Sequence, residues 1–271
     1  MLSNIHKIAM VSAIALAGCG VSLAGAETAS SPVTDPHFEL APGYLAQKDL
    51  PDSLVLLGPP PAEGTATLAR DEESRAATIP LRGKPRWDLA RTDADLAFPQ
   101  PAKNFSCAMG VDIDEKKTPH LYRLMQKVLT DAGLSTYGVK NTYNRTRPFV
   151  VHNEGTCFPD QEPLLRNDGS YPSGHTAAGW AWALVLSEIN PGRTDMLLKR
   201  GIEFGQSRVI CDAHWQSDVD AGRIMGAATV AKLHTNAEFL ADVAAAREEL
   251  KAAGPVEASS CAAEAAALSA Q

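Results

Sequence analysis

The segment at residues 174–188 constrains the fold more than any other part of the sequence, because it is apolar on nearly every side of a predicted helix. It combines two tryptophans with Ala, Leu and Val, and it stops before Asn190-Pro191, where proline cannot continue a helix. A helix without a polar face must be buried among other elements. Strand patterns are nearly absent elsewhere, so the sequence predicts an all-α, single helical domain with this helix in its core.

Other segments show the three- and four-residue spacing of apolar side chains that is typical of helices. In residues 118–133, Thr118 fits an N-cap, Pro119 the first helical position and Gly133 the end. Further helices are expected at residues 65–77, 87–96, 194–204, 214–233 and about 235–254, with residues 134–144 either helix or irregular turn and residues 153–170 a loop. The expected caps of the later helices are Thr194 and Thr235, the latter in a capping box with Glu238.

The first residues have the organisation of a secretory signal peptide. Lys7 precedes an apolar run at residues 8–16, and small residues then lead to an A-x-A site that ends at Ala26. The alternative is a lipoprotein signal of residues 1–18, in which Cys19 becomes the lipidated N-terminus. Both alternatives predict export, so the mature protein is expected to be periplasmic or secreted.

The sequence therefore divides into residues 1–26 as signal peptide, 27–63 as an irregular N-terminal arm, 64–255 as the helical domain and 256–271 as a loose Ala-rich tail. After residue 26 no stretch of about 18 residues is apolar, so no transmembrane segment is expected in the mature chain. The net charge of −7 argues against a nucleic-acid partner, which usually selects a basic surface.

The cysteines beyond the signal peptide are even in number, which in an exported protein indicates disulfides. They are Cys107, Cys157, Cys211 and Cys261, and the sequence does not choose among their three possible pairings. Four free buried thiols are the alternative. A cysteine metal site is disfavoured, because no two of the four have the close spacing that such sites use.

The first motif that indicates chemistry is the basic segment from Lys140 to Pro148, KNTYNRTRP, whose cations are Lys140, Arg145 and Arg147. Lys140 and Arg147 are seven residues apart and would share one face of a helix. A guanidinium offers a planar fork that matches phosphate oxygens, and an ammonium adds a compact charge. On its own, the segment is more typical of a solvated basic surface, because charge runs are common on surfaces.

The second motif is Tyr171-Pro-Ser-Gly-His-Thr176, directly before the apolar helix. The backbone N–H groups of Ser173 and Gly174 would be free at the helix N-terminus, where the helix dipole favours an anion. Gly174 lets the backbone approach such an anion closely, the Ser173 hydroxyl adds a donor, and His175 would lie at the rim. The alternative is a capped helix start with a surface histidine.

The third motif runs from Ser207-Arg208 to His214 and Asp218. His214 and Asp218 are four residues apart and would share one face of a helix. A carboxylate bonded to one ring nitrogen fixes the histidine tautomer and leaves the other nitrogen with a free lone pair, as a nucleophile or base requires. Arg208 adds a further cation for phosphate. The alternative is a surface pair that stabilises the helix slightly.

Taken together, the motifs resemble the three-part signature of the type 2 phosphatidic acid phosphatase superfamily, PAP2. Their order is Lys140-x6-Arg147-Pro148, then Pro172-Ser173-Gly174-His175, then Ser207-Arg208-x5-His214-x3-Asp218. The surrounding sequence is similar in particular to the class A bacterial non-specific acid phosphatases, over about residues 90–235. The resemblance implies a helical fold of the PAP2/haloperoxidase-like type.

The resemblance also implies a role for each matching residue. His214 would attack phosphorus and form a phosphohistidine, Asp218 would orient His214, and His175 would protonate the leaving group and then activate water. The phosphate-binding residues would be Lys140, Arg147, Ser173, Gly174 and Arg208. Because fixed cations take the place of a metal ion, no metal and no cofactor are expected. His214 must be neutral while His175 is protonated, which implies an acidic pH optimum.

The implied reaction is the hydrolysis of phosphate monoesters with broad specificity, with nucleotides, sugar phosphates and aryl phosphates as candidate substrates. A homodimer is a further expectation from the resemblance. One residue departs from the family pattern, since Asp212 stands where a small uncharged residue is expected. An acidic group at this place could raise the pKa of His214 or repel an anionic substrate.

Competing functions remain open from the sequence. A vanadate-dependent haloperoxidase resembles this family but typically has a longer chain. A membrane lipid phosphatase of the superfamily would need several spanning helices. A non-catalytic periplasmic phosphate-binding protein would use the cations but not His175, His214 or Asp218. A metal-dependent hydrolase is disfavoured, because the cations would repel its metal.

Overall fold

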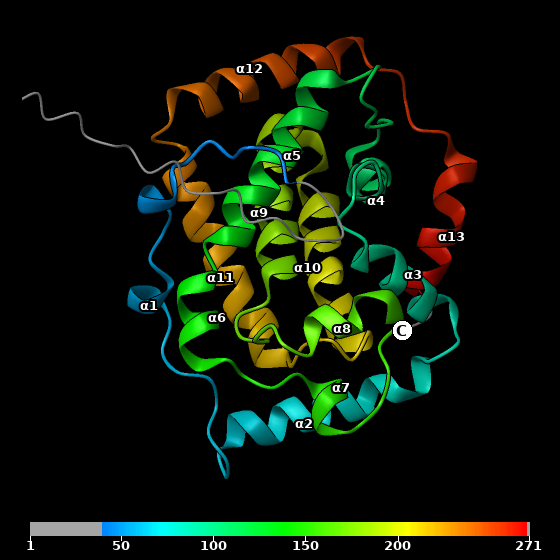
Figure 1. The fold of residues 1–271 in the computed structure, drawn as a ribbon. Helices are drawn as coiled ribbons and strands as arrows, with labels where there is room; N and C mark the ends of the chain where they lie inside the picture. The colour runs from blue at the N-terminus through cyan, green and yellow to red at the C-terminus, as the bar shows by residue number, and fades with distance from the viewer. Residues whose placement is uncertain (1–39, 270–271) are drawn as a thin grey trace, which may run out of the picture. The chain divides into compact units, whose positions relative to one another are not determined.

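The structure is a computed structural model that describes residues 40–269, and within this range the chain is helical and has no β-strand (Figure 1). Extended backbone pairs at an isolated antiparallel bridge between Val111 and Pro255. The prediction of an all-α fold is therefore confirmed. The predicted signal peptide, its lipoprotein alternative with Cys19, and the first part of the N-terminal arm lie outside the described residues.

The helices, in chain order, are η1 (Gln47–Asp49), α1 (Ser53–Leu56), α2 (Ala66–Thr78), η2 (Ile79–Leu81), α3 (Pro85–Ala94), α4 (Gln100–Met109), α5 (Pro119–Leu134), α6 (Tyr137–Tyr143), α7 (Pro148–Val151), η3 (Pro159–Gln161), α8 (Glu162–Leu165), α9 (Gly174–Ile189), η4 (Pro191–Arg193), α10 (Thr194–Ile210), α11 (Gln216–Leu233), α12 (Ala237–Ala252) and α13 (Ala258–Ser269). No helix of the described residues is long and apolar enough to cross a membrane.

Helix α9 is the core helix that its apolar sequence predicts. It packs against α5, α10 and α11, which surround it in Figure 1. Trp182 is fully buried and lies edge-on to Phe105 of α4 and Phe204 of α10. The Trp182 indole N–H donates to the Met125 carbonyl of α5 over 2.8 Å, so the ring is buried without an unpaired polar atom.

Close backbone contact joins α9 to α11 at two glycines. A Cβ atom at Gly222 would lie 2.6 Å from the Ser173 carbonyl oxygen, and one at Gly226 would lie 2.5 Å from the Ala177 carbonyl oxygen. No side chain fits at such distances, so glycine lets α11 lie directly on the first turns of α9. The N-terminal ends of both helices are thereby held together.

The structure corrects several predicted helix ends. Helix α10 continues to Ile210, six residues beyond the predicted end, and Thr194 is its first residue and not its cap. The side chain that caps α12 is Asn236, which accepts from the Phe239 N–H, and the predicted capping box at Thr235 is wrong. Helix α4 was not predicted, although its buried residues Ala102, Phe105 and Met109 recur at three- and four-residue steps.

The C-terminal segment is ordered as α13, and the prediction of a loose tail is wrong. A disulfide between Cys107 of α4 and Cys261 of α13 ties this helix to the bundle. The second disulfide joins Cys157 to Cys211, directly before the third motif. Of the alternatives left open by the sequence, the pairing is thus 107 with 261 and 157 with 211.

Candidate active site

His214 lies in the turn between α10 and α11, and its side chain is 2% exposed. Helix α11 begins at Gln216, so the prediction that His214 and Asp218 share one face of a helix is wrong in its premise. The two side chains nevertheless meet, because Asp218 is the third residue of α11 and reaches back over its N-terminus. His214 Nδ1 lies 3.4 Å from Asp218 Oδ2.

The other ring nitrogen of His214 faces Arg147. His214 Nε2 lies 2.9 Å from Arg147 Nη1, and a guanidinium can only donate. The Nε2 atom must therefore accept, which places the ring hydrogen on Nδ1, toward Asp218. The lone pair of His214 is thus on the nitrogen that faces the cations, where Arg147 donates to it.

Asp218 is fully buried and accepts hydrogen bonds on both oxygens. Its Oδ2 accepts from the Trp215 N–H at 2.9 Å, and its Oδ1 accepts from Arg145 Nη1 at 2.6 Å. Burial raises the pKa of Asp218, and the Arg145 charge opposes this rise most strongly. The carboxylate beside His214 is thus held in place by three donors, namely a ring N–H, a backbone N–H and a guanidinium.

Lys140 and Arg147 converge on one point, although they do not share a helix as predicted. Helix α6 ends at Tyr143, and Arg147 precedes α7 after a turn with a left-handed residue, Asn144. Asp168 brings the two cations together: its Oδ2 lies 2.7 Å from Arg147 Nη2 and 3.5 Å from Lys140 Nζ. Asp168 was not among the predicted site residues.

The second motif forms the N-terminus of α9, as predicted. Ser173 is its N-cap, and the Ser173 hydroxyl accepts from the Thr176 N–H at 3.2 Å. Gly174 is the first helical residue, so its N–H lies in the turn whose donors have no partner within the helix. His175 is partly buried, and its Nε2 lies 3.0 Å from the Ala94 carbonyl oxygen.

Arg208 of α10 is the most unusual cation of the cluster. Its side chain is 1% exposed, yet among the described residues Nε and Nη1 have no hydrogen-bond partner. A buried guanidinium with unpaired donors is costly unless an anion satisfies them. Burial lowers the pKa of Arg208 to about 9, and Arg147 contributes in the same direction.

The charges of the cluster act strongly on both histidines. Burial and the neighbouring charges of Arg147, Lys140 and Arg208 lower the pKa of His214 well below its ordinary value. The pKa of His175 is also lowered well below its ordinary value, by burial first and then by Arg208. Burial lowers the pKa of Lys140 to about 8. Burial and these cations therefore disfavour a positive charge on either histidine ring.

Asp212, the departure from the family pattern, points away from this cluster. Its carboxylate is held by Arg75, with Nε to Oδ1 at 2.8 Å, and by Arg82, with Nη2 to Oδ2 at 3.0 Å. Burial raises the pKa of Asp212, which these two guanidinium groups oppose. Asp212 is not among the main causes of the pKa shift of His214. The negative charge of Asp212, which was expected to repel an anionic substrate, is thus offset by Arg75 and Arg82.

The anionic partners of the cluster were not predicted from the sequence. Asp168 pairs with Lys140 and Arg147, and Asp71 of α2 pairs with Arg145 at 2.7 Å. Nothing in the local sequence of Asp71 marks it, because its partner is 74 residues away. Asp168 directly precedes the Gly-Ser-Tyr-Pro-Ser-Gly-His segment, and this position was the one available signal.

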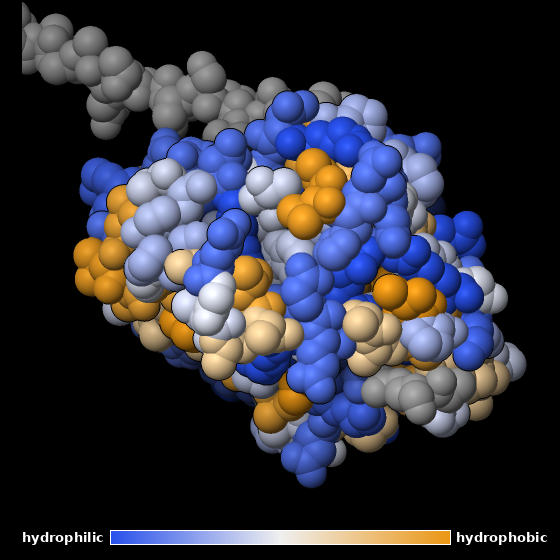
Figure 2. Space-filling model, turned by 90° about the horizontal axis from the view of Figure 1, so that it is seen from below, coloured by the Kyte–Doolittle hydropathy of each residue, from blue (hydrophilic) through white to orange (hydrophobic). Residues whose placement is uncertain are grey.

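The end of the bundle that carries α2 and α7 in Figure 1 is largely hydrophilic, with hydrophobic groups in separate small patches (Figure 2).

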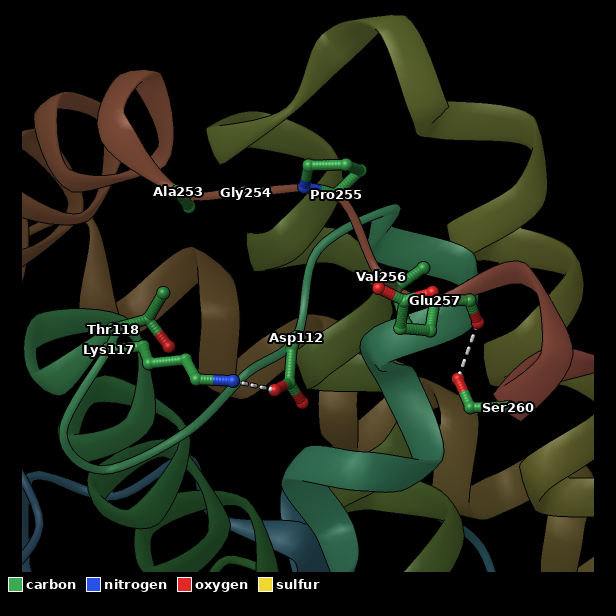
Figure 3. A pocket seen from close by; sticks show the side chains of 9 residues that line it. All are labelled: Asp112, Lys117, Thr118, Ala253, Gly254, Pro255, Val256, Glu257 and Ser260. Atoms are coloured by element: carbon green, nitrogen blue, oxygen red, sulfur yellow. Dashed lines mark hydrogen bonds and ion pairs between the residues drawn. The ribbon is translucent and has the colours of Figure 1, made fainter.

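Elsewhere, a pocket of about 410 Å³ lies between the segment before α5 and the connection from α12 to α13 (Figure 3). Its charged residues include Lys117 and Asp112, which pair with each other at 2.7 Å. None of the predicted site residues lines it. Among the described residues, no group of three or more His, Cys, Asp or Glu is arranged to hold a metal ion.

Comparison with known proteins identifies the family of the chain. The PAP2 superfamily matches residues 125–239, which include all eight predicted site residues. The chain is 47% identical over 207 residues to a non-specific acid phosphatase of Providencia stuartii, covering 76% of this chain and 84% of the relative. It is 47% identical over 200 residues to a non-specific acid phosphatase of Salmonella typhimurium, covering 73% and 80%.

A further relative extends over more of the chain. An acid phosphatase of Zymomonas mobilis is 38% identical over 249 residues, which cover 92% of this chain and 90% of the relative. The matches therefore include regions outside the three motifs. The chain belongs to the PAP2 superfamily and is a relative of the bacterial non-specific acid phosphatases.

Proposed function

We propose that this protein is an acid phosphatase that hydrolyses phosphate monoesters through a phosphohistidine at His214. The names of the relatives from Providencia and Salmonella support the activity. The observation that carries the mechanism is the orientation of the His214 ring. Asp218 accepts from Nδ1, and the lone pair of Nε2 faces Arg147, 2.9 Å away.

Binding comes first in the proposed reaction. Phosphoryl oxygens accept hydrogen bonds from Lys140, Arg147 and Arg208. The unpaired donors of Arg208 match this need. The Ser173 hydroxyl and the Gly174 N–H add donors at the positive end of α9. In place of Asp168, the substrate then becomes the partner of the cations. The fixed cations stabilise the charge on the equatorial oxygens as the reaction proceeds.

The first chemical step transfers the phosphoryl group to the protein. His214 Nε2 attacks phosphorus as the bond to the ester oxygen breaks, and Asp218 stabilises the positive charge that develops on the ring. His175 gives its proton to the leaving oxygen. In the second step His175 takes a proton from water, the new P–O bond forms, the N–P bond breaks and inorganic phosphate leaves.

The charge of the cluster favours an acidic pH optimum. His175 must carry an extra proton to act as an acid, and burial together with Arg208 lowers its pKa. Its protonated form therefore requires acidic solution. A bound phosphoryl dianion offsets part of the surrounding positive charge and raises the pKa of His175 in the complex. The low pKa of His214 keeps this ring neutral, as a nucleophile must be, under the same conditions.

We also propose broad specificity, because every predicted contact is made to the phosphoryl group, apart from the proton that His175 gives to the leaving oxygen. Nucleotides, sugar phosphates and aryl phosphates are candidate substrates. Export to the periplasm or medium is in keeping with the disulfides Cys107–Cys261 and Cys157–Cys211. A homodimer remains an expectation from the family resemblance.

The first test is an assay of p-nitrophenyl phosphate hydrolysis across pH with excess EDTA, beside His214→Ala. We expect an acidic optimum, no effect of EDTA and no activity of the variant. Stopping the wild-type reaction in alkali, in which phosphohistidine survives, should trap protein-bound phosphate that His214→Ala lacks.

Each contrary result identifies another function. Phosphate binding without turnover would favour a binding protein, and halide oxidation that depends on vanadate and peroxide would favour a haloperoxidase. Loss of activity in EDTA would require a metal. An optimum above neutral pH would contradict the assignment of His175 as the acid.

A further inference from the structure

We propose that Arg145 is a positioning residue that holds Asp218 against His214, and that Asp71 of α2 fixes Arg145 in turn. This inference rests on the proposed function of His214 and Asp218. It extends the catalytic apparatus to α2, which lies outside residues 125–239 that match the family. Arg145 lies within the first motif but is not one of the predicted phosphate-binding residues, and Asp71 lies outside all three motifs.

Arg145 makes the strongest contacts of Asp218. Arg145 Nη1 donates to Asp218 Oδ1 at 2.6 Å, while the opposite oxygen, Oδ2, receives His214 Nδ1 and the Trp215 N–H. The guanidinium also lies 5.3 Å from the centre of the Trp215 ring, which restrains it from the side. The two oxygens of Asp218 are thus divided between His214 and Arg145, and the carboxylate cannot rotate without losing one of them.

Asp71 completes a buried chain of charges. Its side chain is 1% exposed, and its Oδ2 accepts from Arg145 Nη2 at 2.7 Å. The same carboxylate accepts from the Ser217 N–H at 2.7 Å and from the Ser217 hydroxyl at 2.6 Å. Arg145 Nη1 also donates to that hydroxyl, at 2.7 Å. Asp71 therefore fixes both Arg145 and the first turn of α11, which carries Asp218.

The charges of Arg145 and Asp71 predict in which direction each substitution should move the pKa of the His214–Asp218 pair. The charged and titratable groups around the His214–Asp218 pair are Lys140 of α6, Arg145 and Arg147 before α7, Asp168 and Tyr171 before α9, His175 of α9, Arg208 of α10 and Asp71 of α2. A proton bound by the pair blocks the nucleophile. Removing a cation near the pair favours that proton, and removing an anion disfavours it.

The alternative is that Asp71 and Arg145 only tether α2 to the bundle. A matched control exists, because Arg70, the neighbour of Asp71 on α2, pairs with Asp220 of α11 at 2.8 Å on the surface. Arg70→Ala removes a contact between the same two helices without touching His214 or Asp218. A mere tether predicts similar effects of the variants at positions 70 and 71.

The experiment compares Arg145→Gln, Arg145→Lys, Asp71→Asn and Arg70→Ala with the wild type. Steady-state kinetics with p-nitrophenyl phosphate across pH should show kcat of Arg145→Gln reduced by roughly 10- to 100-fold, with a smaller change in KM. The acidic limb of its kcat/KM profile should move to higher pH. In Asp71→Asn it should move to lower pH. Arg145→Lys should recover part of kcat, and Arg70→Ala should match the wild type.

A second readout does not depend on turnover. In protein with ¹⁵N-labelled histidine, the His214 ring, assigned by its absence from His214→Ala, should titrate at higher pH in Arg145→Gln than in the wild type. An unchanged His214 titration in Arg145→Gln, or shifts of the same sign in Arg145→Gln and Asp71→Asn, would overturn the proposal. A wild type without phosphatase activity would overturn the proposed function instead, so the two failures are distinguishable.

Discussion

At the scale of single residues, the two active-site histidines are fixed in opposite tautomers. The Ala94 carbonyl can only accept, so His175 carries its hydrogen on Nε2 and has its lone pair on Nδ1. Arg147 can only donate, so His214 carries its hydrogen on Nδ1 and turns Nε2 toward the cations. Each ring therefore offers one lone pair, and the two lone pairs are available for different tasks.

The assignment of His175 as the acid predicts a dependence on the leaving group. His175→Asn should reduce the hydrolysis of an alkyl phosphate far more than that of p-nitrophenyl phosphate, since p-nitrophenolate leaves without a proton. General acid catalysis contributes roughly 10²- to 10⁴-fold, and the loss with the alkyl ester should fall in this range. Parallel kcat/KM measurements on both substrates test it. Equal losses on the two would show that His175 does not protonate the leaving group.

Lys140 predicts the pH dependence of phosphate binding. Burial lowers its pKa to about 8, so the ammonium of the free enzyme loses its proton as pH rises through this value. Phosphate affinity should therefore weaken above pH 8, by up to about tenfold per pH unit. Calorimetric titration with inorganic phosphate from neutral to alkaline pH measures this. In Lys140→Arg, which stays charged, the weakening should disappear, and its persistence would assign the titration to another group.

The cations around His214 could be predicted from the sequence, while the acidic residues that hold them could not. Lys140, Arg147 and Arg208 stand in recognisable motifs, and the structure brings them around His214. Asp71 and Arg145 meet across 74 residues, and this contact depends on how α2 packs, which no local pattern encodes. Asp168 directly precedes the second motif, but a single acidic residue in a loop does not indicate which cations it pairs with.

At the scale of elements, the site is built from helix ends. Two of the predicted arguments from helical spacing fail, since α6 ends before Arg147 and α11 begins after His214. The residues still meet, because turns bring chain segments as close as a shared helix face does. The apolar pattern of α9 predicted its burial correctly, because burial depends on composition averaged over the helix. A helix boundary depends on single caps, such as Asn236, and is harder to predict.

The contact between α9 and α11 gives a prediction at this scale. In Gly222→Ala the new Cβ would meet the Ser173 carbonyl, so α11 must move away and carry Asp218 from its place. We expect a loss of about 1–3 kcal/mol in the free energy of unfolding, together with a lower kcat. Gly133→Ala is the control: a Cβ there meets nothing within 4 Å, and alanine in a helix should add about 0.5–1 kcal/mol. Urea unfolding and steady-state kinetics of both variants test these expectations. A Gly222→Ala protein with wild-type kcat would show that the contact between α9 and α11 does not position the site.

At the scale of the whole molecule, one disulfide stabilises the bundle and the other holds a turn of the candidate active site. Cys107–Cys261 closes a loop with a sequence separation of 154 and fastens α13, which contacts α3 and places Glu264 3.3 Å from the buried Arg200. Cys157–Cys211 has a separation of 54 and fastens the turn that carries Asp212 and His214. The backbone N–H of Cys157 also donates to the Cys211 carbonyl at 3.2 Å, which reinforces that turn.

Separate removal of the two disulfides should therefore have different consequences. Cys107→Ser with Cys261→Ser should lower the free energy of unfolding by about 2–4 kcal/mol and leave kcat unchanged, because Glu264 of α13 pairs with Arg200 and not with a residue of the cluster around His214. The Cys157–Cys211 disulfide closes a shorter loop, so its removal in Cys157→Ser with Cys211→Ser should cost no more stability. This double variant should nevertheless have a lower kcat, since the His214 turn loses its covalent anchor. Chemical unfolding and kcat, measured on both double variants below the onset of unfolding, separate the two effects. If both lower kcat equally, the position of His214 depends on the stability of the entire bundle and not on its own turn.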